Sequence, residues 1–366
     1  MKSSEDNRKR AKAAGIKDIA TALGVSIGTV DRALHQRPGI NPMTRTRVLK
    51  MAQTLGYRPN VAARNLRLDK KLSISVHLPE EIASFFDALR EGIEEAAVPF
   101  QDSVELQFRT YPRLGEGDTE LFAEALEDKT NGIILAPGHP ADLKPWIRKA
   151  ARSHVPVVCV ATDAPGTERL TAVSIDSYSS GATVAELLAR CAQKAGDLLV
   201  ITGDLSTVDH SEKVRGVREF LTKMKSSLIL AGVVETHDDP ERTYAMVKDA
   251  LAARKNLAAV YVSTANSLPV LQAMEDAGRV TGTLVITTDL FPRLIPLIRN
   301  GNVLATIYQR PRAQGRMAFR SMYQFLVEGT CPPLRQRLPA HIILQSNLDL
   351  FLEMQTADME GVASSS

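Results

Sequence analysis

The sequence predicts an α/β protein in two parts, a small all-helical unit at the N-terminus and a large, two-lobed parallel α/β region. Between residues 15 and 58 apolar residues recur at helical spacing, whereas after Lys71 short β-rich runs alternate with helical stretches. The charge is divided in the same way. Residues 1–71 contain 16 Lys and Arg against 5 Asp and Glu, a net charge of +11, while the remaining residues carry 29 against 37, a net charge of −8.

The N-terminal unit begins with two short helices joined by a tight turn. Gly24 permits the turn, and Ser26 is a suitable N-cap for the second helix because its hydroxyl can accept a backbone hydrogen bond. The apolar residues at helical spacing are Ile16, Ile19, Ala20 and Leu23, then Val30, Ala33 and Leu34. This pattern predicts a helix-turn-helix whose two apolar faces pack together.

The free face of the second helix carries small or short side chains and one basic group. These residues are Ile27, Gly28, Thr29 and Arg32. A helix that reads DNA needs such a face, because it must enter the major groove and aim a guanidinium at a guanine edge. The sequence therefore predicts that these four residues contact DNA.

A third helix is expected after Asn41, which is a plausible cap and is followed by Pro42 at the first helical position. Its predicted apolar stripe is Val48, Leu49, Ala52 and Leu55. Gly56 is expected to end it and the following Tyr57-Arg58-Pro59 to be extended, since a residue before proline avoids helical geometry. Residues 62–68 can form a short helix that is marginal alone.

The amino-acid sequence of this unit resembles that of the lactose repressor (LacI/GalR) family, through the segments IKDIATALGVSIGTVDRAL, TRTRVLKMAQTLGYRPN and AARNL. The resemblance implies that the last segment is a hinge helix that forms in the minor groove of a bound operator, where Leu66 matches the leucine that wedges into the central base step. The full set of DNA-contacting residues that it implies is Ile27, Gly28, Thr29, Arg32, Asn60, Ala63, Arg64 and Leu66.

The basic charge of the N-terminal unit suits phosphate neutralisation, with a solvated basic surface as the alternative. Cys159, Cys191 and Cys331 are widely separated, which indicates neither a disulfide framework nor a zinc site and favours a reducing cytoplasm. Neither a hydrophobic leader nor an apolar run long enough for a membrane span is found. We therefore expect a cytoplasmic, nucleoid-associated protein without membrane partners.

The large region shows the same alternation of strand and helix patterns in two halves. The predicted strands are LSISVHL, VELQFRTY, GIILAPG and VPVVCVATD in the first half, and AVSI, DLLVITGD, ILAGVVE, AAVYVST, TLVITTD and ATIYQ in the second. Open parallel sheets bind ligands at the carboxyl ends of their strands, and two facing halves create a cleft. Binding is expected there.

The order of the predicted elements and the sequence of residues 72–351 resemble those of the type 1 periplasmic sugar-binding fold, which the lactose repressor family uses as its effector domain. The matching segments include FFDALREGIEEA, DHSEKVRGVREFL and VITTDLFPRLIPLIRNGNVLATIYQRPRAQGRMAF. The ligand-binding residues that the resemblance implies are Phe85, Phe86, Thr162, Asp163, Lys213, Asn266, Asp289 and Gln309. Aromatic rings can cover the apolar face of a pyranose, while a carboxylate and a cation hold its hydroxyls.

Each ligand assignment has an alternative. In the alternative, one of Phe85 and Phe86 is ordinary core, Asp289 is a structural cap, and Lys213, where relatives place an arginine, is a solvated helix residue. Relatives that bind sugars often carry an Asp-Arg pair after the VPVV-type strand, whereas residues 161–164 here read ATDA. This departure leaves specificity for a simple sugar open.

Enzymatic functions find no support in the pattern. The stretch GVSIG at residues 24–28 matches the nucleophile elbow G-x-S-x-G, but a helix rather than a strand precedes it. The sequence lacks both glycine-rich phosphate loops after its strands, and its seven histidines contain no i, i+4 pair, although His210 beside Asp209 is either a surface or a cleft residue. No catalytic residue, cofactor or metal is therefore expected.

We expect a ligand-responsive transcription regulator that binds operator DNA as a homodimer or a tetramer. The alternatives are a sugar-binding transport or chemotaxis protein and a sugar-processing enzyme, and neither accounts for the N-terminal unit. The expected organisation is a mobile basic tail (1–14), a DNA-binding domain (15–58), a hinge (59–71), an effector-binding and dimerisation domain (72–355) and a mobile tail (356–366).

Overall fold

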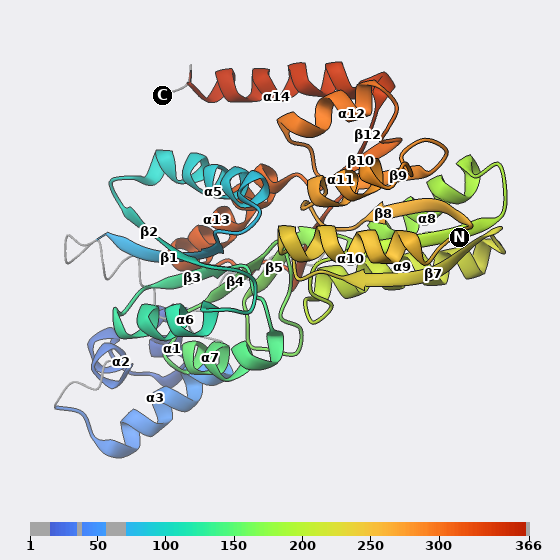
Figure 1. Cartoon of the computed structure of the whole chain (residues 1–366). Coiled ribbons are helices and arrows are strands. Elements are labelled where there is room, and N and C mark those ends of the chain that lie inside the picture. The colour runs from blue at the N-terminus through green and yellow to red at the C-terminus, as the bar shows by residue number, and fades with distance from the viewer. Residues whose placement is uncertain (1–14, 35–38, 56–70, 364–366) are drawn as a thin grey trace, which may run out of the picture. The chain divides into compact units, whose positions relative to one another are not determined.

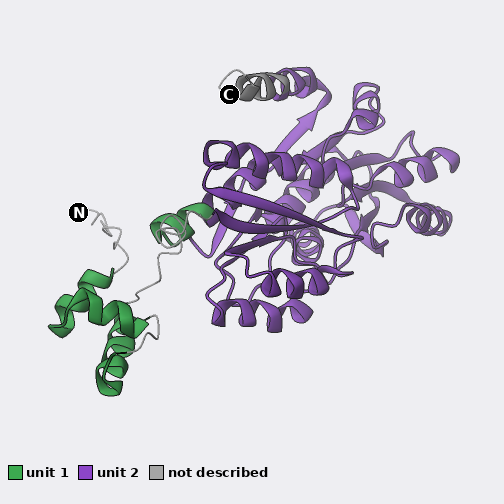
Figure 2. Cartoon of the chain, turned by 90° about the vertical axis from the view of Figure 1, so that its left-hand side faces the viewer, with its two compact units in different colours: residues 1–70, 323–331 green, residues 71–322, 332–366 purple. Residues whose placement is uncertain are grey.

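The computed structural model describes residues 15–34, 39–55 and 71–363, with side chains placed up to residue 355. The chain divides into two compact units, residues 1–70 with 323–331 and residues 71–322 with 332–366 (Figure 2). The predicted N-terminal tail, and the predicted hinge except Lys71, lie outside the described residues.

The N-terminal unit contains α1 (Ile16–Leu23), α2 (Ile27–Leu34) and α3 (Pro42–Thr54). Gly24 adopts the left-handed conformation (φ 64°) that the tight turn between α1 and α2 requires. The predicted caps are confirmed, since Ser26 Oγ accepts a hydrogen bond from Thr29 N at 3.1 Å and Asn41 Oδ1 accepts one from Met43 N at 2.8 Å. The predicted helix-turn-helix is thus present.

Apolar side chains from all three helices form a small shared core. Its buried members are Ile19, Ala20, Val30, Ala33, Val48 and Ala52. The prediction that Leu49 and Leu55 join this core was wrong, because they are 47% and 37% exposed. Leu49 points about 100° away from Val48 around the helix, and Met51 packs against the core instead.

The larger unit contains two six-stranded sheets, which define lobe 1 and lobe 2 together with their covering helices (Figure 1). The strands of lobe 1, in spatial order, are β11 (Arg335–Leu338), β5 (Thr171–Ile175), β4 (Val157–Val160), β3 (Gly132–Leu135), β1 (Leu72–Pro79) and β2 (Val104–Tyr111). Those of lobe 2 are β12 (His341–Leu344), β10 (Ala305–Tyr308), β9 (Leu284–Thr288), β8 (Leu257–Val262), β6 (Gly196–Thr202) and β7 (Leu228–Glu235). All neighbouring strands are parallel except β10 and β12.

Helices cover both faces of each sheet, as a parallel sheet requires. In lobe 1 these are α5 (Ala83–Ala97) with α13 (Pro311–Glu328), and α6 (Asp118–Glu127) with α7 (Pro140–Arg152). In lobe 2 they are α8 (Ser177–Cys191) with α9 (Val208–Met224), and α10 (Pro240–Ala252), α11 (Leu268–Asp276), α12 (Ile295–Arg299) and α14 (Leu348–Ala363). Strand β6 illustrates the pattern, because Leu198 packs under α8 and α9 whereas Leu199 packs under α10 and α11.

The chain passes between the lobes three times. It crosses from β5 to α8, from β10 to α13, and from β11 to β12. The crossings lie on neighbouring strands, since β11 pairs with β5 and β12 pairs with β10. This connectivity brings the carboxyl ends of the parallel strands in the two lobes toward one another.

Two helix pairs cross at glycines, one pair in each lobe. A Cβ on Gly315 of α13 would lie 2.1 Å from the backbone oxygen of Leu89 in α5, and a Cβ on Gly181 of α8 would lie 2.0 Å from that of Lys213 in α9. Glycine is therefore required at both crossings, because any side chain there would overlap the opposite backbone.

Both parts of the predicted fold class are confirmed. The AVSI strand, predicted as part of the second half, is β5 and belongs to lobe 1, because it pairs with β4. The sequence did not predict β11, β12, α12, α13 or α14, and the structure continues α14 to Ala363, where the sequence predicts a mobile tail from residue 356. Residues that favour helix formation, such as Met354 and Gln355, directly precede this segment, so the helix continues through it. Among the described helices, none combines the length and apolar character needed to cross a membrane.

Candidate functional site

Helix α2 presents the predicted DNA-reading face. Ile27, Gly28 and Arg32 are exposed, with Ile27 51% exposed, while Thr29 is half-buried. The Thr29 hydroxyl lies 2.8 Å from Ser26 Oγ, so this residue takes part in the cap of the helix. The other predicted DNA contacts, Asn60, Ala63, Arg64 and Leu66, lie outside the described residues.

The predicted ligand residues all follow the carboxyl ends of strands in the two lobes. Phe85 and Phe86 lie in the first turn of α5, after β1, and both are buried. Their rings meet edge to face with centroids 5.0 Å apart, which is a favourable aromatic geometry. Because both rings are buried, their burial does not distinguish a ring that faces the ligand from one that belongs only to the core.

Asp163 follows β4 and is held by two arginines. Its carboxylate makes a two-point ion pair with the buried Arg169 and accepts a further hydrogen bond from Arg335 Nε at 3.1 Å. An Asp-Arg pair therefore does follow this strand, with the arginine six residues downstream of the aspartate. Its neighbour Thr162 is buried, and its Oγ1 lies 3.4 Å from the backbone N of Asp209 in lobe 2.

Lys213 lies in α9 and is only 1% exposed, so the alternative of a solvated helix residue is wrong. Its Nζ donates hydrogen bonds to the backbone oxygen of Ser263 at 3.0 Å and to Asp209 Oδ2 at 3.3 Å. Burial opposes the charged form, but Asp209, Tyr261 and Asp289 together outweigh it, so the pKa of Lys213 lies above its ordinary value.

His210 is also buried, which rules out the surface alternative for this residue. Its Nδ1 lies 3.2 Å from Thr202 Oγ1, and its Nε2 lies 3.9 Å from a carboxylate oxygen of both Asp209 and Asp238. Burial raises the pKa of Asp238, whose Oδ1 accepts a hydrogen bond from Thr264 Oγ1 at 2.5 Å. Asn266 belongs to the same group, since its Nδ2 donates to the backbone oxygen of Asp238 at 2.7 Å.

Asp289 and Gln309 contact each other. The Asp289 carboxylate is 4% exposed and accepts hydrogen bonds from Gln309 N at 2.8 Å and Gln309 Nε2 at 2.6 Å. Burial raises the pKa of Asp289 to about 6, although these hydrogen bonds and Lys213 act in the opposite direction. Gln309 lies on the crossing from β10 to α13, so the pair links the end of β9 to a segment between the lobes.

Sequence analysis missed the residues at which the two lobes meet. His139 Nε2 of lobe 1 lies 3.1 Å from Asp204 Oδ2 of lobe 2. This hydrogen bond to Asp204 raises the pKa of His139. Burial would raise the pKa of Asp204, but hydrogen bonds from Ser206 and His139 outweigh it and lower the pKa to about 2. No sequence pattern connects residues 65 positions apart.

Glu81 is a second missed residue, and it follows β1 in lobe 1. Burial, followed by the Asp238 carboxylate of lobe 2, raises its pKa to about 7. Two carboxyl groups from opposite lobes, Glu81 and Asp238, therefore repel one another electrostatically. The facing strand ends combine these carboxyl groups with Lys213, hydroxyls and amides, and such a set can hold a hydroxylated molecule by charge-assisted hydrogen bonds.

Residues 15–60 match the family described as bacterial regulatory proteins, lacI family, and residues 74–330 match the periplasmic binding protein domain family. The chain therefore carries a lacI-family regulatory domain followed by a periplasmic binding protein domain, and the second of these family models covers more than half of the chain. The match to DNA-binding transcription regulators confirms the prediction that this chain is not an enzyme. The match over residues 15–60 also distinguishes this chain from transport proteins that share only the fold of the larger unit.

Two curated relatives illustrate the similarity of this chain to named bacterial proteins. It is 26% identical over 330 residues to "Catabolite control protein A" of Priestia megaterium, covering 89% of this chain and 97% of the relative. It is 28% identical over 205 residues to "HTH-type transcriptional regulator DegA" of Bacillus subtilis, covering 56% and 59%.

Solved structures resemble the larger unit of this chain. GanP, a glucose-galactose binding protein from Geobacillus stearothermophilus, matches with a TM-score of 0.71 at 23% identity, covering 76% of this chain and 99% of GanP. An ABC transporter solute-binding protein from Burkholderia graminis, solved with D-arabinose, matches with a TM-score of 0.70 at 22% identity, covering 76% and 97%. At this identity the likeness shows the fold.

Proposed function

We propose that this chain is a ligand-responsive repressor that binds a near-palindromic operator as a homodimer and senses a sugar or sugar-like molecule between its lobes. In this proposal residues 15–58 bind DNA, residues 59–71 form the hinge, and residues 72–355 bind the effector and form the dimer. A protein that acts on the chromosome works in the cytoplasm, at the nucleoid. The proposal rests above all on one combination: an exposed α2 face in a chain whose larger unit gathers buried polar groups at facing strand ends.

The DNA-binding part is supported by the exposure and chemistry of α2. Arg32 is exposed beside the small Gly28, which lets the helix approach base edges while the guanidinium reaches guanine O6 and N7. One helix-turn-helix reads only a half-site, so two copies related by a two-fold axis fit a near-palindromic operator.

The effector part is supported by the groups at the strand ends. Asp289 offers carboxylate oxygens, Lys213 an ammonium and Gln309 an amide, and the Phe85 and Phe86 rings offer an apolar face. The solved neighbours include proteins described as binding glucose, galactose and D-arabinose, which agrees with a polyhydroxylated ligand.

The DNA proposal is tested by mobility shifts on an operator selected from a random pool, with sedimentation to determine the oligomeric state. Arg32→Ala is expected to weaken operator binding by about 1–3 kcal/mol and binding to random DNA by less. Lys17→Ala, a change at an exposed residue of α1, is the charge-matched control. Equal losses on both DNAs, or a monomer that binds a single half-site tightly, would contradict the proposal.

The effector proposal is tested by a thermal-shift screen of sugars, polyols and sugar phosphates, because a ligand that binds only the folded state raises apparent stability. Calorimetry with the ligand found then compares Asp289→Ala and Gln309→Ala with Asp249→Ala, a change at an exposed residue of α10. Asp289→Ala is expected to cost about 1.5–3 kcal/mol for each charged hydrogen bond lost. Parent-like binding by both site variants would refute the assignment.

A further inference from the structure

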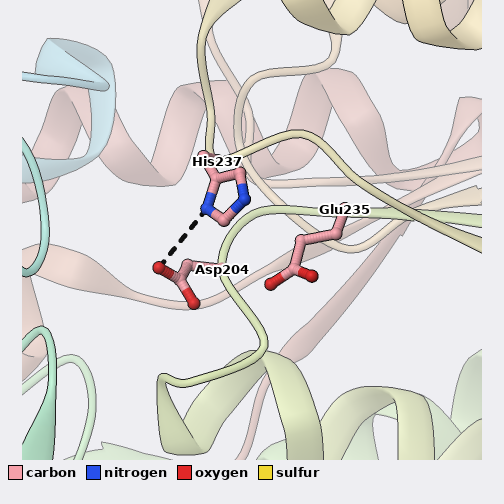
Figure 3. A group of neighbouring side chains, drawn as sticks. All are labelled: Asp204, Glu235 and His237. Carbon is pink, nitrogen blue, oxygen red and sulfur yellow. Dashed lines mark ion pairs between the residues drawn. The ribbon is translucent and has the colours of Figure 1, made fainter.

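A second polar group lies at the edge of lobe 2, apart from the predicted ligand residues. Asp204 closely follows β6, Glu235 ends the neighbouring strand β7, and His237 lies two residues farther along. Thr202 is in register with Glu235, so the parallel pairing brings these residues to one edge. One possible ligand atom from each of the three lies within 4.8 Å of the others (Figure 3).

His139 of lobe 1 contacts this group through Asp204, although it is not one of the three residues whose ligand atoms all lie within 4.8 Å of one another. His139 Nε2 lies 3.1 Å from Asp204 Oδ2, and His237 Nδ1 lies 3.4 Å from that same oxygen. Two imidazole rings from opposite lobes therefore converge on one carboxylate oxygen. Glu235 adds a second carboxylate beside them (Figure 3).

The protein orients three of these groups through their other atoms. Asp204 Oδ1 accepts hydrogen bonds from Ser206 N and Ser206 Oγ at 2.8 and 2.6 Å, and Glu235 Oε1 accepts one from Leu205 N at 2.7 Å. His139 Nδ1 lies 3.5 Å from Asp142 Oδ2. A carboxylate behind a histidine and hydrogen bonds behind a carboxylate are the outer-shell partners that metal ligands need.

The distances also suit a metal ion. In a tetrahedral site with bonds of about 2.0–2.2 Å to imidazole nitrogen and carboxylate oxygen, neighbouring ligand atoms lie about 3.3–3.6 Å apart. The two distances to Asp204 Oδ2 are within a few tenths of an ångström of this range. The His139 and His237 side chains are 35% and 37% exposed, so an ion has access from solvent.

We propose that Asp204, Glu235 and His237 bind a divalent first-row transition-metal ion such as Zn²⁺, and that His139 moves from its contact with Asp204 to become the fourth ligand, which ties lobe 1 to lobe 2. Imidazole together with carboxylate favours such ions, whereas Mg²⁺ and Ca²⁺ prefer oxygen ligands alone. Two neutral imidazoles and two carboxylates supply a charge of −2, which the ion neutralises. The proposal does not depend on the identity of the effector.

The experiment uses the full-length chain without an affinity tag, stripped by a chelator, and calorimetric titration with ZnCl₂ and with MgCl₂. His237→Asn removes one ligand, and His154→Asn is the matched control, because both histidines have a positive φ, 52° and 60°, that asparagine tolerates. His154 is exposed in lobe 1. His139→Asn tests the link between the lobes, and Glu235→Gln removes a ligand charge while keeping the side-chain shape.

The parent and His154→Asn are expected to bind one Zn²⁺ per chain and no Mg²⁺. His237→Asn is expected to bind Zn²⁺ at least ~100-fold more weakly, and His139→Asn and Glu235→Gln at least ~10-fold more weakly. Thermal unfolding without metal establishes that each variant folds. A Co²⁺-loaded parent is expected to show the intense visible absorption of four-coordinate Co²⁺, and this result does not depend on any variant.

The proposal is overturned if the stripped parent takes up no Zn²⁺, since the four groups would then form ion pairs only. It is also overturned if His237→Asn and His154→Asn bind Zn²⁺ equally. Parent-like Zn²⁺ affinity in His139→Asn overturns the link between the lobes.

Discussion

Replacing Asp289 by asparagine removes a buried charge while keeping its contacts. The carboxylate accepts two hydrogen bonds, both from Gln309. An asparagine keeps one acceptor for the Gln309 backbone N–H, and a flip of the Gln309 amide lets its oxygen accept from the asparagine Nδ2. The change therefore isolates the free energy of ionisation at this position.

The magnitude follows from the pKa of Asp289, which burial raises from its ordinary value of 3.8 to about 6. A shift of about two pH units corresponds to about 3 kcal/mol. Because the folded pKa is the higher one, the native chain binds more protons than the unfolded chain between pH 4 and 6. The buried, charged carboxylate therefore lowers the free energy of unfolding. This reduction is absent below about pH 4, grows as pH rises to about 6, and is constant above that.

Asp289→Asn is therefore expected to match the parent near pH 4 and to be more stable by up to about 3 kcal/mol at pH 7.5. Urea unfolding of both proteins at a series of pH values, followed by far-ultraviolet circular dichroism, measures the difference. A stability difference that stays constant from pH 4 to 7.5 would show that Asp289 does not titrate as its burial requires.

Three further changes test the packing. Lys213→Met leaves Asp209 buried without its cation, and urea unfolding is expected to show a loss of about 3–5 kcal/mol that Asp209→Asn in the same chain partly restores. Gly315→Ala places a Cβ 2.1 Å from the Leu89 oxygen and is expected to cost at least about 1–3 kcal/mol, measured by thermal unfolding; an unchanged melting temperature would contradict the close crossing. Ser26→Ala removes the cap of α2 and is expected to cost about 1 kcal/mol, seen as faster amide exchange at Thr29; unchanged exchange would contradict the cap.

Local chemistry made the N-terminal unit predictable. Turn, caps and apolar spacing lie within a few residues of one another, so Gly24, Ser26 and Asn41 could be assigned from sequence. Leu49 and Leu55 were misassigned because apolar character alone does not say which face a small core can cover. The strands of the larger unit that sequence analysis found could be predicted because a strand buried on both faces appears in the sequence as a continuous apolar run.

Contacts between distant segments were not predictable. Lys213 is buried only because Asp209 and Ser263 satisfy its charge, and the strand order that brings Ser263 there cannot be read from residue spacing. His139 and Asp204 meet only because both lie at facing strand ends. The short strands β11 and β12 carry charged or mixed sequences that resemble loops, and they pair with β5 and β10, which other elements separate from them in the sequence.

The three crossings between the lobes restrict how the lobes can move. Segments that join two bodies at neighbouring points resist sliding, because sliding stretches at least one segment, while bending about their common line leaves all three lengths unchanged. Opening is therefore expected to be a rotation about one axis. Gln309 lies on one of these segments, and Asp289 holds both its backbone and its side chain. A ligand hydroxyl that hydrogen-bonded to the Asp289 oxygens in place of Gln309 would release that segment. The Asp289 carboxylate would then determine both the affinity for the ligand and how easily the two lobes rotate about their common axis.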